Sequence, residues 1–93
     1  MMSRKVFAIH PGSMLKDEME ERGISMNALA RAIRVPPNRV SAIVNGRRGI
    51  TADTAFRLGR FFGTSPQMWV NLQTAYDLAQ VDAAKITREV LAL

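Results

Sequence analysis

The chain of 93 residues contains no cysteine and a single histidine, His10. The absence of cysteine excludes disulfide scaffolds, thiolate zinc sites and a cysteine nucleophile. Because one histidine cannot assemble a metal site alone, we expect no metal and no cofactor, and we predict a structural or helix-capping role for His10. A chain without disulfides also favours a cytoplasmic location.

Long apolar runs are missing as well. No stretch approaches the roughly 20 consecutive apolar residues that a membrane-spanning helix needs, and the apolar run at residues 6–9 is far too short for a signal peptide. The hydrophobic fraction of 47% is nevertheless typical of a folded globular domain. A domain this small can bury only a small hydrophobic core and often gains stability from a second copy, so we expect a homodimer.

Acidic residues are few, with eight against thirteen basic ones and a net charge of +5. Between residues 22 and 60 eight arginines stand beside one acid, Asp53, whereas four acids gather at residues 17–21. This separation favours one face that binds phosphates and another that is turned away from them. A solvated arginine-rich surface is the alternative, and for Arg57 and Arg60 both interpretations stay open. The acids lie on open helix faces and not in a pocket, so we expect no enzyme.

Glycine, proline and capping residues divide the chain into five or six short helices with hardly any strand signal, which predicts an all-α fold. We expect a first helix from about Ser13 to Arg22, ended by Gly23. Later helices are expected to begin at four capping residues and at Pro37, which suits a first helical position. The four predicted caps are Ser25, Thr51, Ser65 and Asp82.

Apolar residues at helical spacing indicate which side of each helix faces the core. The last helix would be marginal alone, so it needs something to pack against; we predict that its stripe docks on a partner subunit or on another protein. The expected inward residues are Met14, Leu15 and Met19; Leu29, Ala30 and Ile33; Val40 and Ile43; Ala55, Leu58 and Phe61 or Phe62; Met68, Trp69, Leu72, Ala75 and Tyr76; and, in the last helix, Ala83, Ile86 and Val90.

The second and third helices, joined by a three- or four-residue turn, have the form of a DNA-reading helix-turn-helix, spanning about residues 25–45. With Val40 and Ile43 buried, the third helix presents side chains suited to base edges: asparagine for adenine, arginine for guanine, serine for either, and an alanine methyl for thymine. These outward residues are Asn38, Arg39, Ser41, Ala42 and Asn45. Ser25, Asn27, Arg47 and Arg48 surround them and suit backbone phosphates.

Six stretches together resemble the HigA antitoxin family, within the phage-repressor (Xre) type of helix-turn-helix. They cover most of residues 10–78 and comprise residues 10–12 (HPG), 27–30 (NALA), 35–39 (VPPNR), 44–55 (VNGRRGITADTA), 61–66 (FFGTSP) and Trp69 with Asn71, Leu72 and Gln73. The resemblance implies a lambda-repressor-like domain over residues 10–80. We expect an N-terminal arm (1–9) before this domain and a helical tail (81–93) after it.

The resemblance also implies an antitoxin that neutralises a HigB-type, RelE-like mRNA-cleaving toxin and, as a dimer on double-stranded operator DNA, represses its own operon. The base-contacting residues that it implies are Pro37, Asn38, Arg39, Ser41 and Ala42. The phosphate-contacting residues are Asn27, Asn45, Arg47 and Arg48. A solitary Xre-type regulator without a toxin is an alternative, and a protein-interaction module that has kept this shape is another.

Three features depart from the family pattern. Arg34 stands where the turn usually has glycine, and a left-handed backbone there would strain an L-residue. Ser13 replaces a common acidic residue, and the tail after Ala79 matches no part of the family.

Overall fold

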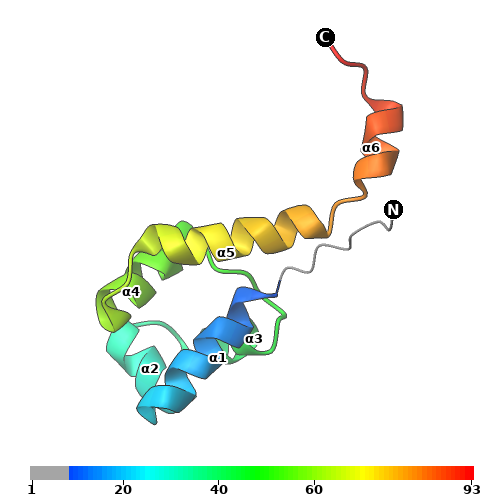
Figure 1. Ribbon diagram of the computed structural model, residues 1–93. Helices are drawn as coiled ribbons and strands as arrows, with labels where there is room; N and C mark the ends of the chain where they lie inside the picture. Colours follow the sequence, from blue (N-terminus) through cyan, green and yellow to red (C-terminus); the bar gives the residue numbers. More distant parts are fainter. Residues whose placement is uncertain (1–8) are drawn as a thin grey trace.

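The computed structural model describes residues 9–93, so the predicted arm lies almost wholly outside the described residues. Within them the chain forms six helices and no strand, as predicted (Figure 1). The helices are α1 (Pro11–Arg22), α2 (Met26–Ile33), α3 (Pro37–Val44), α4 (Ala52–Phe62), α5 (Pro66–Ala79) and α6 (Ala83–Glu89). None of them is long and apolar enough to cross a membrane.

All four predicted caps are confirmed. The side chains of Ser25, Thr51, Ser65 and Asp82 each accept a hydrogen bond from the backbone N–H three residues later, at 3.0–3.3 Å. Each bond satisfies a donor that the first turn of a helix leaves without a partner.

The first helix begins two residues earlier than predicted, at Pro11. His10 Nδ1 accepts a hydrogen bond from the backbone N–H of Gly12 at 2.9 Å, which confirms the capping role of His10. Pro11 occupies the first helical position, where its missing N–H costs nothing. The expected start at Ser13 was wrong because an imidazole can cap a helix as a hydroxyl does.

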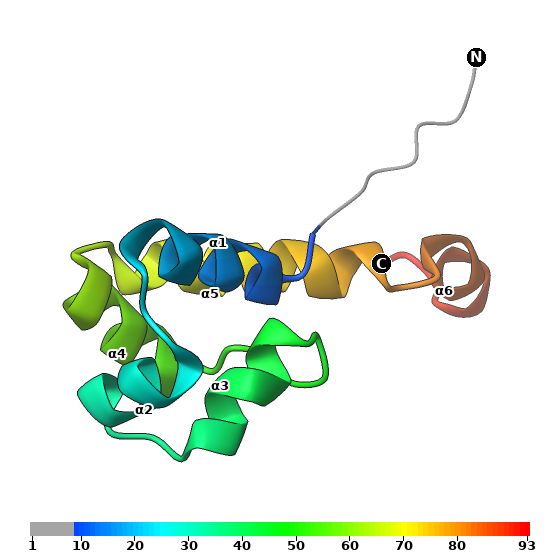
Figure 2. The same ribbon diagram turned by 90° about the horizontal axis from the view of Figure 1, so that it is seen from below.

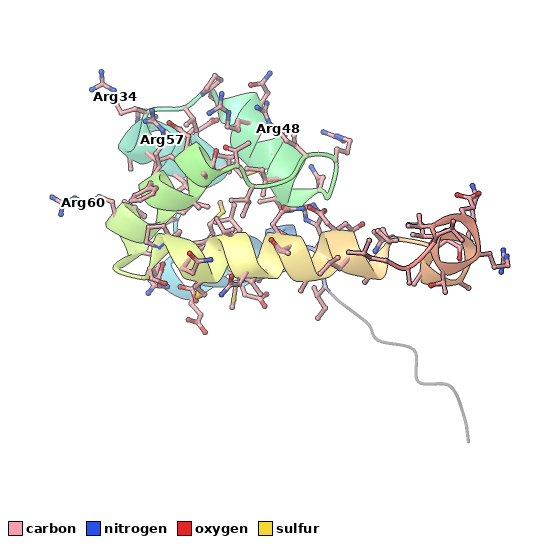
Figure 3. All side chains as sticks on the ribbon, turned by 90° about the horizontal axis from the view of Figure 1, so that it is seen from above. Arg34, Arg48, Arg57 and Arg60 are labelled. Carbon is pink, nitrogen blue, oxygen red and sulfur yellow. The ribbon has the colours of Figure 1, made fainter. Side chains whose placement is uncertain are left out.

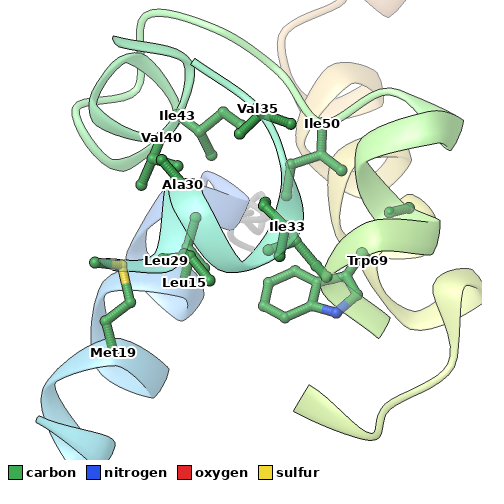
Figure 4. Close-up of a cluster of buried hydrophobic side chains, with 12 residues drawn as sticks. Leu15, Met19, Leu29, Ala30, Ile33, Val35, Val40, Ile43, Ile50 and Trp69 are labelled. Atoms are coloured by element: carbon green, nitrogen blue, oxygen red, sulfur yellow. The ribbon is translucent and has the colours of Figure 1, made fainter. Parts of the chain in front are cut away.

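Twelve apolar side chains from α1 to α5 and the loops between them form one core (Figure 4). Leu29, Leu58 and Trp69 are fully buried, and the indole N–H of Trp69 donates to the hydroxyl of Thr64 at 2.9 Å. Figure 4 shows Val40 and Ile43 of α3 beside Ala30 of α2. The core therefore holds α3 against α2 while α4 and α5 pack on each other.

Gly12 allows α1 to lie directly against the end of α3. A Cβ atom at this position would overlap the carbonyl group of Ile43, so a larger residue would push the two helices apart. At the same end, the ring of His10 packs edge-on against Tyr76 of α5, with centroids 4.8 Å apart. The start of α1 thus joins α3 to α5.

Of the two predicted alternatives Phe61 and Phe62, Phe62 packs against the core and Phe61 is 40% exposed. The prediction for Ala75 was wrong, because this residue lies on the outer, exposed side of α5. The last helix ends at Glu89, before the predicted stripe residue Val90; its residues are all exposed, and Figure 1 shows it beyond the end of α5.

Candidate DNA-binding face

Helices α2 and α3 form the predicted helix-turn-helix. Figure 2 shows it on the lower side of the molecule, with α1 and α5 along the upper side. Val40 and Ile43 are 1% and 2% exposed, and Leu29 of α2 is fully buried. An eight-residue helix is not stable alone in water. Its conformation and its orientation therefore depend on these buried contacts.

The opposite side of α3 is open to solvent. Pro37 and Asn38 are exposed, while Arg39, Ser41 and Ala42 are half-buried, so all five predicted base-contacting residues reach the surface from one short helix. The Nε atom of Arg39 is buried and has no hydrogen-bond partner among the described residues. The stem of Arg39 is therefore held against the protein, which restricts its rotamers before any ligand binds.

The turn between α2 and α3 is left-handed at the position where the family usually has glycine. Arg34 has φ 64° and ψ 48°, and it is the one non-glycine residue with positive φ in the described part of the chain. Its conformation lets the N–H of Val35 donate to Ala30 O at 3.0 Å, which closes the end of α2. A left-handed conformation costs an L-residue roughly 1–2 kcal/mol.

The predicted phosphate-contacting residues fall into two groups. Ser25 and Asn27 are exposed at the start of α2, where free backbone N–H groups attract an anion. Asn45, Arg47 and Arg48 are exposed in the loop after α3. The N–H groups of both arginines donate to Ala42 O, at 2.8 and 3.2 Å, so the loop folds back on α3.

Gln73 on α5 holds the far side of that loop, a role that the sequence did not reveal. Its Oε1 accepts a hydrogen bond from Ile50 N at 2.7 Å, and its Nε2 donates to Asp77 Oδ1 at 2.9 Å. Gly49 lies so close that a Cβ atom there would stand 2.9 Å from the Gln73 amide. The sequence did contain one signal for this role: Gln73 is a polar residue four positions after Trp69 and therefore lies on the inward side of α5.

Arg57 connects α4 to the end of α2. Its Nε donates to Asp53 Oδ1 at 2.6 Å, and its Nη1 donates to the carbonyl of Ile33 at 2.9 Å. The hydrogen bond from Arg57 lowers the pKa of Asp53, and the positive charges of Arg57 and Arg39 act in the same direction. Arg57 is thus engaged within the protein, whereas Arg60 stays exposed.

No group of three or more histidine, aspartate or glutamate side chains within residues 9–93 is placed to hold a metal ion. The exposed polar side chains of α3 and of the loop after it carry amides, a hydroxyl and guanidinium groups. Such groups suit hydrogen bonding to base edges and charge pairing with phosphates.

We expect Gln73→Met to release the loop that carries Arg47 and Arg48. Methionine keeps the length of the side chain but cannot accept the bond from Ile50 N, and an unsatisfied, partly buried donor costs about 1–3 kcal/mol. Urea unfolding should show that loss, and hydrogen exchange should show faster exchange of the Ile50 amide. Gln67→Met is the matched control, because Gln67 makes a similar but exposed bond to Asn71 on the same helix. Equal Ile50 exchange in both variants would contradict the role of Gln73.

Comparisons with known proteins agree with this geometry. A helix-turn-helix family model matches residues 15–69. Virulence-associated protein I of Dichelobacter nodosus is 52% identical over 79 residues, which are 84% of this chain and 73% of that protein. An addiction module antidote protein of a HigA family from Coxiella burnetii is 47% identical with a TM-score of 0.88, over 95% of this chain and all of that one. Pseudomonas aeruginosa antitoxin HigA, solved with the higBA promoter, is 49% identical with a TM-score of 0.86, over 94% and 99% of the two chains. The chain therefore belongs to the helix-turn-helix family and, within it, to the HigA antitoxins.

Proposed function

We propose that this protein is a sequence-specific DNA-binding antitoxin that neutralises a HigB- or RelE-like mRNA-cleaving toxin and represses its own operon. The observation that carries the DNA-binding part is the geometry of α3, whose buried Val40 and Ile43 turn Asn38 and Arg39 outward. The solved HigA of Pseudomonas aeruginosa with the higBA promoter supports a promoter as the ligand. The antitoxin names of the structural relatives support the toxin partner.

In this proposal the five outward residues of α3 read bases, and residues at its borders bind phosphates. Pro37, Asn38, Arg39, Ser41 and Ala42 enter the major groove of double-stranded operator DNA. Asn27 and Ser25 bind phosphates from the start of α2, and Asn45, Arg47 and Arg48 bind them from the loop after α3. The two groups of phosphate contacts hold α3 in register on the duplex.

A second copy of this chain is the proposed partner for the surface around Phe56. This side chain is 68% exposed and stands between two hollows of about 630 and 440 Å³. Ala32, Ile33 and Phe61 contribute to the first hollow, and Ala52, Pro66 and Val70 to the second. A protruding ring beside a hollow on the same surface suits a two-fold interface, in which each copy fills the hollow of the other. A homodimer would place two α3 helices about 34 Å apart, in successive major grooves.

Arg39→Ala should reduce the free energy of operator binding by on the order of 1–3 kcal/mol, because a bidentate contact to guanine at one base position is lost. Arg47→Ala should instead weaken all duplexes alike and lower the slope of log K against log salt by about one unit for each bound subunit. Binding titrations on the operator, on operators changed at single bases and on random DNA measure both effects. Equal loss on operator and random DNA for Arg39→Ala would exclude base reading by Arg39.

Phe56→Ser should weaken dimerisation about 100- to 10,000-fold, because a two-fold interface loses the burial of one large apolar side chain from each copy, about 1.5–3 kcal/mol each. Sedimentation equilibrium at micromolar protein gives the dissociation constant. Ile86→Ser is the control, since Ile86 is also exposed but lies on α6. A dimer that survives Phe56→Ser but dissociates with Ile86→Ser would place the interface on α6.

Co-expression with the product of a neighbouring small toxin-like reading frame should restore the growth that this product alone arrests, and the two proteins should co-purify. The Arg39→Ala variant should rescue growth as well, since toxin binding does not require base reading. Failure of both rescue and co-purification, with operator binding intact, would favour a solitary transcriptional regulator.

A further inference from the structure

The turn before α3 contains a strained residue that the packing of the protein does not explain. Arg34 adopts a left-handed backbone conformation in which glycine would be free of strain. Its side chain is exposed, and among the described residues its guanidinium takes part in no hydrogen bond or ion pair. The left-handed backbone closes the end of α2, but no contact of the Arg34 side chain inside the protein offsets the strain that a glycine would avoid. Strained residues of this kind concentrate at functional sites.

The direction of the Arg34 side chain differs from that of its neighbour Arg57. Figure 3 shows the Arg34 guanidinium pointing away from the body of the molecule, while Arg57 lies closer to it. Arg57 is held by Asp53 and by the carbonyl of Ile33. Unlike Arg57, Arg34 is therefore available to an external anion.

Arg34 and the Arg47–Arg48 pair stand at opposite ends of α3. Arg34 precedes the first residue of the helix by three positions, and Arg47 follows its last residue by three. Eight helical residues span about 12 Å, close to the width of the major groove. Figure 3 shows Arg34 and Arg48 along the same edge of the molecule, with Arg60 lower down at the end of α4.

We propose that Arg34 binds a backbone phosphate of duplex DNA on the side of the major groove opposite to Arg47 and Arg48. The strain in the turn is then offset by the contribution of this charge to DNA affinity. The proposal rests on the proposed DNA-binding function and adds a contact that a glycine at this position could not make.

The test is to replace Arg34 and measure stability and DNA binding together, because the two should change in opposite directions. Arg34→Gly should raise the midpoint of thermal unfolding by about 4 °C as the strain disappears. The same variant should bind duplex DNA about fivefold more weakly per bound subunit at 0.15 M salt, with the salt slope reduced by about one unit. A merely structural role of Arg34 would leave the salt slope unchanged.

Two further variants complete the experiment. Arg34→Lys keeps the charge and should retain most of the salt slope. Arg88→Ala removes another exposed arginine, on α6 and away from α3, and should leave the slope unchanged. If Arg47→Ala lowers the slope but Arg34→Gly does not, the Arg34 contact is refuted while the DNA-binding function stands. If the unaltered protein binds no duplex DNA in a salt-dependent way, both proposals fail.

Discussion

The orientation of α3, on which the proposed function depends, is set by the burial of Val40 and Ile43. Full burial of one such side chain contributes roughly 1.5–3 kcal/mol, and α3 has only eight residues with which to hold its helical form. Both side chains point into a core supplied by α1, α2 and the loops on either side of α3. The polar residues of α3 face outward because the apolar residues of the same helix are buried in this core.

Helix α5 holds the loop that follows α3 in place. Trp69 of α5 is fully buried in the core, and one turn later on the same helix Gln73 Oε1 accepts a hydrogen bond from the N–H of Ile50. The loop with Arg47 and Arg48 is thus fastened at one end to the carbonyl of Ala42 and at the other to α5. Phosphate contacts made by a fastened loop lose less conformational entropy on binding than contacts from a free one.

Some arginines are paired within the protein and others are exposed around α3, and the strained residue is one of the exposed ones. On α1, Glu18 pairs with Arg22 of the same helix. Arg57 is tied into the protein, whereas Arg34, Arg47 and Arg48 remain exposed around α3. The strained turn at Arg34 shows that this chain keeps a cation at a place where a glycine would fold more easily.

Short-range chemistry made much of the fold predictable. A hydroxyl or carboxylate that caps a helix bonds to an N–H three residues later, and apolar spacing marks one side of a helix, so the four caps and the buried pair on α3 followed from the sequence alone. The sequence likewise indicated the outward residues of α3, whereas whether the turn at Arg34 is left-handed was decided only by the structure. The choice between Phe61 and Phe62, by contrast, depended on how α4 rotates against α5.

The contacts of Gln73 with Ile50 and of Arg57 with Ile33 were also decided only in the tertiary structure. They join residues 23 and 24 positions apart. No local rule brings such residues together. Their approach is a result of the packing of whole helices.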